Sequence, residues 1–387
     1  MVGRSGAPDP SRMRQTCTAG DKNPQPSQIT HPDQIVRVDS PTALLAVIPR
    51  LLGFIPQASV VVIGTAPPRS RIRVTLRYDL PDPPGLGVAA DLAAHAADVI
   101  RSQELDAAVA VGYGPEALVT PVADAIREAL PRAGIEVQEF LRVQDLRYWS
   151  YVCRNEACCP AAGAPVDPDL HSAPALADFG IPVLADRTAL AACVAPVGGS
   201  AAESMRQATR RAEQHVAHLL TKVRKSARLG AARQMIAAEG LAAVGGMITR
   251  YRGGAGFITD DEIARITVAL RDLRIRDDAW ARMDPAHTEA HQRLWTDVVR
   301  RAQPGYVPAP AALLAFVAWQ SGHGALANVA LDRALADDPR YSMALLLRQV
   351  ITAGAPPHLA RLPMTPEEVA ASYDGLDVDD QDQEMDD

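Results

Sequence analysis

The sequence predicts an α/β half followed by an all-helical half. Strand-like and helix-like segments alternate along the first part of the chain, and from residue 186 onward only helical periodicity is found. The length of 387 residues exceeds what one hydrophobic core usually holds. We therefore expect an α/β domain over residues 35–185, with a mixed, partly parallel sheet and covering helices, and a helical domain over residues 186–360.

The elements of the first half follow from composition and periodicity. Residues 1–34 are polar and rich in proline, which predicts a disordered leader. Ser40 and Pro41 are typical of a helix N-cap and first helical position. Apolar β-branched runs and period-two alternation indicate strands, and apolar residues three and four apart indicate helices. The predicted strands are residues 35–38, 59–64, 71–78, 107–111 and 136–143, and the predicted helices are residues 41–52, 88–103 and 115–130.

The helices of the second half have clear boundary signals. Thr259 and Glu262 form a capping-box pair that opens a helix to about residue 276. Further helices are predicted at residues 287–301, 310–320, 325–336 and 341–352.

Residues 308–341 resemble a tetratricopeptide unit. This pattern places small and turn residues where two helices touch and turn, namely Trp319, Gly322, Ala327, Ala334, Leu335, Asp338 and Pro339. One unit is recognisable, whereas a solenoid needs about three. A helical packing motif is therefore favoured over a peptide-binding groove.

Charge and hydropathy exclude several classes of protein. Eight carboxylates and no base lie in residues 374–387, within a predicted acidic, disordered tail at residues 361–387, so the remaining chain carries 39 − 38 = +1. No apolar run approaches the roughly 18 to 20 residues of a membrane span. No secretory signal is evident, because no apolar region follows the arginines near the N-terminus. The five cysteines, odd in number and with three of them close together, argue against a disulfide framework. We expect a cytoplasmic protein without a membrane partner.

The first chemical candidate is a cysteine-rich segment at residues 148–165. It carries Cys153, Cys158 and Cys159, and His171 is the nearest possible fourth ligand. Zinc takes four thiolate or imidazole ligands, so a zinc site is one interpretation. Buried structural thiols, a redox pair or an enzymatic nucleophile are the others.

An aromatic cluster precedes these cysteines. Tyr148, Trp149 and Tyr151 lie within four positions of a chain with 4% aromatic residues. Such rings are typical of a recognition surface, and the alternative is a strand that plugs the edge of the sheet.

Basic residues suggest two further binding hypotheses. Arg71, Arg73 and Arg77 alternate along one predicted strand, which is typical of an anion site or of a solvated face. Residues 204–234 are the most basic part of the chain, which indicates a solvated helix or a surface for nucleic acid or an acidic partner.

Common catalytic and nucleotide-binding motifs are missing from the sequence. The segment Gly112-Tyr-Gly114 between a strand and a helix lacks the third glycine of a dinucleotide fingerprint. Walker, Gly-x-Ser-x-Gly and His-Glu-x-x-His motifs are absent.

Several of these segments together resemble the actinobacterial family catalogued as domain of unknown function 4192. The resemblance covers residues 35–360 and implies no activity, cofactor or catalytic residue. Its most specific part is the cysteine-tryptophan segment. The matching motifs are residues 44–53 with Phe54 and Pro56, residues 73–80 with Asp79-Leu-Pro81, Trp149-Ser-Tyr151, Cys153, Cys158-Cys-Pro160, Leu270-Arg-Asp272, Arg276-Asp277, Ala318-Trp319 and Asp338-Pro339.

The sequence therefore favours a non-catalytic binding or regulatory module with a protein partner. A metal-dependent or thiol-dependent enzyme that uses the three cysteines is the first alternative. Nucleic-acid association through residues 204–234 is the second.

Overall fold

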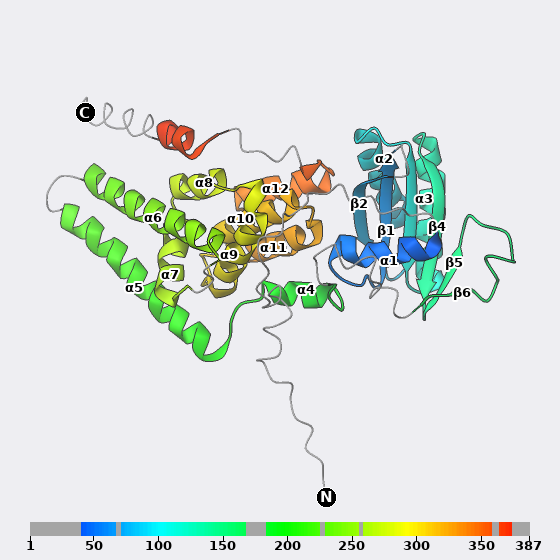
Figure 1. Cartoon of the computed structure of the whole chain (residues 1–387), viewed down its shortest axis with the longest axis horizontal. Helices are drawn as coiled ribbons and strands as arrows, with labels where there is room; N and C mark the ends of the chain where they lie inside the picture. Colours follow the sequence, from blue (N-terminus) through cyan, green and yellow to red (C-terminus); the bar gives the residue numbers. More distant parts are fainter. Residues whose placement is uncertain are drawn as a thin grey trace, which may run out of the picture. The chain divides into compact units, whose positions relative to one another are not determined.

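The computed structural model describes residues 40–66, 71–167, 183–224, 229–254, 258–357 and 364–373. The chain divides into two compact units, Met1–Ala189 and Leu190–Asp387 (Figure 1). We call them the α/β unit and the helical unit. The division lies close to residue 186, where the sequence changes to purely helical periodicity. The predicted leader and the predicted strand at residues 35–38 lie outside the described residues.

The α/β unit is built on a six-stranded mixed sheet with the order β2-β1-β3-β4-β5-β6. Among the described strands, only β3 and β4 pair in parallel, and the other neighbours are antiparallel. The mixed, partly parallel sheet of the sequence prediction is confirmed. The strands are β1 (Ser59–Ala66), β2 (Arg71–Asp79), β3 (Ala107–Tyr113), β4 (Glu136–Gln144), β5 (Arg147–Ser150) and β6 (Ala164–Pro165).

Both faces of this sheet are apolar and covered. Helices α2 (Leu86–Ser102) and α3 (Glu116–Arg132) form a core with Val60, Val62 and Phe140. The alternate residues Val61 and Val111 are fully buried on the opposite face. Helix α1 (Pro41–Leu52) lies in front of the strands in Figure 1 and supplies a buried apolar side of its own.

Two local features of the sequence explain where α1 begins and how α3 packs on β3. The predicted N-cap of α1 is confirmed, because the Ser40 hydroxyl accepts the backbone N–H of Ala43 at 3.1 Å. A Cβ at Gly112 would lie 2.4 Å from Val119, so glycine lets α3 pack directly on the end of β3.

The helical unit contains no strand among its described residues. Helix α4 spans the division between the units, and a final helix covers residues 366–373. The named helices are α4 (Arg187–Cys193), α5 (Gly199–Arg224), α6 (Leu229–Arg252), α7 (Asp260–Ala269), α8 (Leu273–Ala281), the 3₁₀ turn η4 (Pro285–His287), α9 (Thr288–Arg301), α10 (Pro308–Gln320), α11 (Gly324–Asp337) and α12 (Ser342–Thr352).

Helices α10 and α11 form the antiparallel hairpin expected from residues 308–341. Ala327 and Ala334 are fully buried where the two helices touch, and Gly322 makes the turn with a φ of 78°. The hairpin is present, whereas its likeness to a tetratricopeptide unit stays a prediction.

Two predicted boundaries in the helical unit are wrong. One helix was expected from Thr259 to about residue 276, but α7 ends at Ala269 and the carboxylate of Asp272 caps α8 by accepting the Arg274 N–H at 2.9 Å. The disordered tail expected from residue 361 does not hold for residues 366–373. There Thr365 and Glu368 bond each other's backbone N–H as a capping box, and Val369 is buried.

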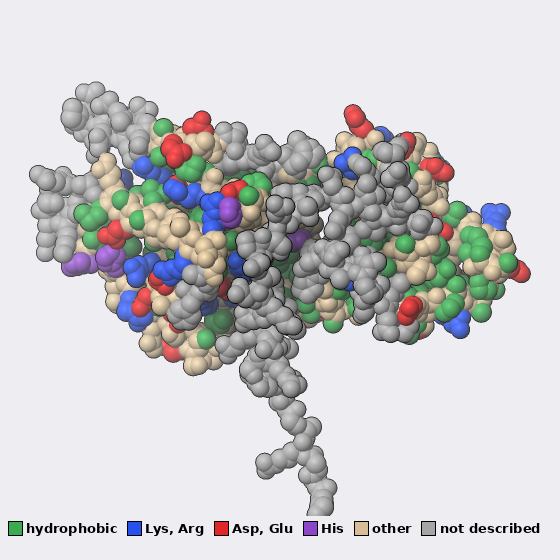
Figure 2. Space-filling model, in the orientation of Figure 1, with side chains coloured by type: hydrophobic (Ala, Val, Ile, Leu, Met, Phe, Trp, Pro, Cys, Tyr) green, Lys and Arg blue, Asp and Glu red, His purple; other side chains and the backbone are tan. Residues whose placement is uncertain are grey.

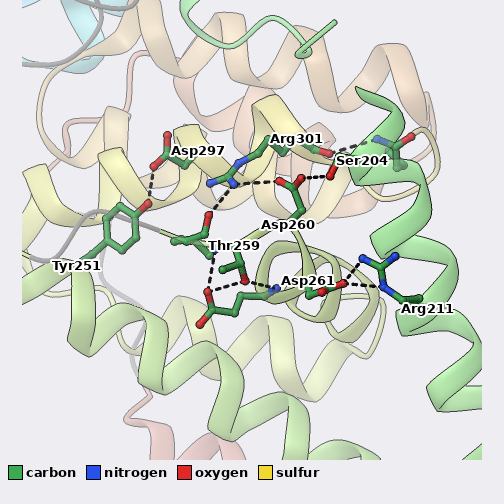
Figure 3. Close-up of polar contacts among 11 residues, drawn as sticks. Ser204, Arg211, Tyr251, Thr259, Asp260, Asp261, Asp297 and Arg301 are labelled. Carbon is green, nitrogen blue, oxygen red and sulfur yellow. Dashed lines mark hydrogen bonds and ion pairs between the residues drawn. The ribbon is translucent and has the colours of Figure 1, made fainter. Parts of the chain in front are cut away.

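A cluster of polar side chains with hydrogen-bond partners, which we call the α7 cap cluster, joins the start of α7 to α5, α6 and α9 (Figure 3). The expected capping box is confirmed, with Thr259 and Glu262 bonded reciprocally. Asp260 accepts hydrogen bonds from Ser204 at 2.6 Å and from Arg301 at 3.4 Å. Arg211 of α5 contacts Asp261 at 2.6 Å. Because each of these groups has its partner, the cluster serves to fix helices.

None of the helices within the described residues combines the length and the apolar character that crossing a membrane requires.

Candidate metal centre

The three clustered cysteines lie on the loop between β5 and β6, at one edge of the sheet. Hydrophobic side chains, coloured green together with cysteine, gather at this end of the α/β unit in Figure 2. Cys158 is exposed, and Cys153 and Cys159 are half-buried. The loop is thus open to an ion from solvent.

Two turns bring the sulfurs together. At the first turn, the Ser150 hydroxyl accepts the backbone N–H groups of Val152 and Cys153 at 3.1 and 2.8 Å. That hydroxyl donates to the Glu139 carboxylate at 2.7 Å, which ties the turn to β4. At the second turn, the carbonyl oxygen of Asn155 accepts the backbone N–H groups of both Cys158 and Cys159, at 3.2 and 2.8 Å. Adjacent cysteines thereby point toward one site.

The sulfur geometry suits a single thiophilic ion. The Sγ atoms of Cys153, Cys158 and Cys159 all lie within 4.8 Å of one another, and those of Cys153 and Cys158 are 3.2 Å apart. Two sulfurs bound tetrahedrally at about 2.3 Å from one zinc ion are about 3.8 Å apart. Small side-chain rotations are therefore enough to place all three sulfurs on one ion.

The three thiols differ in acidity because they share protons. Hydrogen bonding from the backbone of Asn155, and then from the two neighbouring thiols, lowers the pKa of Cys153. The hydrogen bond to Cys153 raises the pKa of Cys158. Burial, and then hydrogen bonds with the other two thiols, raises the pKa of Cys159 to about 12. Cys153 is therefore the thiol that loses its proton first, and an ion must displace the protons of Cys158 and Cys159.

The fourth predicted ligand, His171, lies outside the described residues. Sequence reasoning missed the supporting residues Glu139, Ser150 and Asn155. Asn155 carried a weak signal, since asparagine favours turns in which its side chain accepts the backbone N–H two residues on, as Asn155 does from Ala157 at 3.0 Å. Glu139 carried none, because its role depends on the pairing of β4 with β5.

The predicted aromatic cluster is divided between the two faces of the sheet. Trp149 lies against Gly163, where a Cβ would be 2.6 Å from the ring, and the Arg142 guanidinium stacks on the ring at 3.8 Å. Its Nε1 donates to the Ala161 carbonyl oxygen at 3.1 Å. This packing favours the interpretation of Trp149 as an edge plug that holds the far end of the cysteine loop.

The two tyrosines of the cluster have different surroundings. Tyr151 packs edge-on against Phe140, and its hydroxyl is 2.6 Å from that of Thr120. Tyr148 lies beside the thiols, and burial, followed by the charges of Cys159 and Cys158, raises its pKa. Tyr148 is therefore the aromatic residue that adjoins the sulfurs.

The arginines of β2 do not form a continuous stripe. The register of β1 with β2 shifts so that Gly64 pairs with Val74 and Thr65 with Ile72, which leaves Arg73 unpaired and exposed. Arg77 is 15% exposed and pairs with Asp79 at 2.5 Å. The side chain of Arg71 lies outside the described part.

The turn at Gly112 and Gly114 is closed to a phosphate. The Gly114 N–H donates to the Val143 carbonyl oxygen at 3.0 Å. Helix α3 begins with Glu116, whose carboxylate contacts Arg142 at 3.5 Å and whose negative charge disfavours an anion at this helix N-terminus.

Acidic neighbours neutralise much of the basic segment at residues 204–234. Arg206 and Arg210 both contact Glu203, and Arg211 contacts Asp261. Figure 2 shows basic and acidic side chains mixed over the helical unit. Lys222, Arg224, Lys225 and Arg228 have side chains outside the described residues.

Comparisons with known proteins give one match. No curated protein and no solved structure matches the chain. The profile of the family described as "Domain of unknown function (DUF4192)" matches residues 41–358. This stretch is well over half of the chain and contains the whole cysteine loop. The family to which the chain belongs is therefore DUF4192.

Proposed function

We propose that this chain is a non-catalytic binding or regulatory protein in which Cys153, Cys158 and Cys159 bind a thiophilic metal ion, with zinc as the first candidate. The observation that carries the proposal is the convergence of three Sγ atoms within 4.8 Å. Thiolate ligands favour zinc, copper(I) and iron over hard cations such as magnesium and calcium.

The metal ion would act as a cross-link for the loop. The two turns at Ser150 and Asn155 are local, and Trp149 holds the loop only at its far end. A bound ion adds direct bonds between the turns, so its binding free energy becomes folding free energy of the loop. The exposed loop surface, including Tyr148, then becomes a rigid surface for a protein partner.

A thiol-based function is the second candidate, and the short distance between Cys153 and Cys158 favours it. Two Sγ atoms 3.2 Å apart can form a disulfide after a small rotation when a small disulfide oxidant accepts the two electrons and two protons and leaves as two thiols. The lowered pKa of Cys153 favours its thiolate as the attacking group. A redox pair and a metal site use the same sulfurs, so one experiment separates them.

The experiment measures metal content and affinity of the full reduced chain. Plasma mass spectrometry gives the metal content after purification, and competition with a chromophoric chelator gives the zinc affinity. We expect one ion per chain, and Cys158→Ser or Cys159→Ser should weaken zinc binding about 100-fold or more because each removes a ligand. Ser150→Ala should weaken it about tenfold, because Ser150 positions Cys153 without touching the ion.

The matched control is Glu156→Gln, which changes a possible oxygen ligand on the same loop that lies outside the sulfur cluster. This variant should bind zinc as the parent chain does. Substoichiometric metal in the reduced protein, together with equal affinity in the cysteine variants, would contradict the metal site. An intact mass lower by two hydrogens in unreduced protein, mapped to Cys153 and Cys158, would support the redox pair instead.

A further inference from the structure

A second feature of the α/β unit is independent of the cysteines: three buried hydrogen-bond donors lie at one end of the sheet. They are the hydroxyl of Ser59, the Nε of Arg77 and the hydroxyl of Tyr113, none of which has a partner among the described residues. Ser59 is fully buried, and the Arg77 side chain is 15% exposed. We call this set the donor cluster.

Strand register places the three side chains together on one face. Ser59 of β1 lies directly opposite Tyr113 of β3 and opposite Asp79 of β2. Directly opposed residues share a face and have Cβ atoms about 4.5–5.5 Å apart. Arg77 is two residues before Asp79 on the same face, and its guanidinium reaches that carboxylate at 2.5 Å. The guanidinium is thereby drawn toward the row that holds Ser59 and Tyr113.

The missing partner must be an acceptor. The Nε–H of arginine can only donate, and both hydroxyls can donate as well. Burial raises the pKa of Tyr113, so its hydroxyl keeps its proton at neutral pH. Buried donors without acceptors are costly and uncommon in native proteins, and here three of them are neighbours. A group that offers several acceptor oxygens satisfies all three at once.

The position in the sheet is also one where ligands bind. β3 and β4 run parallel, and Tyr113 is the last residue of β3. In open α/β sheets, ligands bind outside the carboxyl ends of parallel strands. The donor cluster lies at this end, on the face opposite α2 and α3, because Ser59 and Tyr113 alternate with the core residue Val60 and with Gly112, which faces α3.

We propose that Ser59, Arg77 and Tyr113 form a binding site for a small oxyanion, a phosphate or carboxylate group, at the carboxyl end of β3. Asp79 opposes this binding, since its carboxylate neutralises Arg77 from the exposed side. The hydroxyl groups therefore contribute much of the recognition, and the charge of Asp79 limits the affinity.

The test is isothermal titration of the full chain with inorganic phosphate and, separately, with acetate, at constant ionic strength in chloride. We expect saturable one-to-one binding of at least one of the two anions. Tyr113→Phe and Ser59→Ala should each weaken it about tenfold or more, since each removes a hydrogen bond to a charged group. Asp79→Asn should tighten anion binding severalfold, because the substitution removes the carboxylate that neutralises the Arg77 guanidinium.

Two controls keep the result interpretable. Tyr151→Phe removes a hydroxyl of the same unit that already has a partner in Thr120, so anion binding should not change. Without anion, Tyr113→Phe should melt at the same or a higher temperature than the parent chain, because it removes an unpartnered donor. Absence of saturable binding of either anion, or equal affinities in all variants, would overturn the proposal and indicate that water alone satisfies the three donors.

Discussion

The cysteine loop of the α/β unit and the α7 cap cluster of the helical unit use polar groups in opposite ways. Around Thr259, carboxylates, hydroxyls and guanidinium groups are matched: the capping box closes the start of α7, and the contacts of Asp260 and Asp261 join α7 to α5 and α9 (Figure 3). On the cysteine loop, three thiols contact mainly one another, and they compete for protons. A cluster whose polar groups all have hydrogen-bond partners stabilises the structure, whereas a cluster with groups that lack such partners can still bind a ligand.

The donor cluster belongs with the cysteine loop in this comparison. Its three groups are buried without acceptors, in the same sheet whose apolar cores are well packed. The cysteine loop and the donor cluster thus give the α/β unit two groups of side chains that can take a ligand, and the α7 cap cluster gives the helical unit a rigid junction. The predictions below test this contrast, from the largest expected effect to the smallest.

The first prediction concerns the pH dependence of metal binding. The raised pKa values of Cys158 and Cys159 keep both protonated near neutral pH, so binding of an ion to all three sulfurs must release at least two protons. Zinc affinity should therefore fall about 100-fold or more for each unit that the pH is lowered between pH 8 and pH 6. Chelator competition across this range measures the slope. A flat profile would show that the thiols are not the ligands.

The second prediction concerns His291, one of several side chains of the helical unit, like Thr209 and Trp280, with buried polar atoms that have no partner among the described residues. Its two ring nitrogens are buried and have no partner among the described residues, and burial, followed by the charge of Arg252, lowers its pKa to about 4. The neutral ring is favoured in the folded state, so the contribution to stability is complete above about pH 6.5 and is lost as the pH falls toward 4. The loss should reach about 3 kcal/mol.

Chemical unfolding at pH 7 and at pH 4.5 measures this effect. His291→Leu should lose less stability on acidification than the parent chain, since leucine cannot be protonated. His218→Leu changes an exposed histidine and should keep the parental pH dependence. Equal pH dependence in all three proteins would show that His291 is not the group responsible.

The third prediction tests whether Trp149 plugs the edge of the sheet or forms part of a recognition surface. Trp149→Ala removes the contact with Gly163, the stacking of Arg142 and one hydrogen bond, so the free energy of unfolding should fall by about 2 kcal/mol. Gly163→Ala places a Cβ against the same ring and should destabilise by a similar mechanism. Unchanged stability with loss of partner binding would identify a recognition surface instead.

The smallest changes in the free energy of unfolding are expected within the α7 cap cluster. There the capping box of Thr259 can be compared with the ion pair of Arg211. Thr259→Ala removes the capping box and should cost about 1 kcal/mol of unfolding free energy. Arg211→Ala breaks an ion pair whose side chains are both more than half exposed, and should cost less than about 0.5 kcal/mol. Urea unfolding of the two variants gives both values, and a larger loss for Arg211→Ala would show that the ion pair, and not the cap, fixes the junction.

Local signals in the sequence were sufficient for most of the secondary structure. The cap at Ser40 and the box at Thr259 depend on residues at most three apart, and both are present in the structure. The same kind of signal at Thr365 and Glu368 was obscured by the acidic residues that follow, and at Asp272 by uninterrupted helical periodicity on both sides.

The sequence by itself determined the fold class, the change to helices near residue 186 and the candidate cysteines, because each depends on periodicity or on spacing along the chain. Only the tertiary structure decided that the three sulfurs converge, that Trp149 packs against Gly163 and Arg142 and that Ser59 lies opposite Tyr113. These facts depend on strand order and register, which bring together residues far apart in sequence. A one-residue change of register would move every such side chain to the other face.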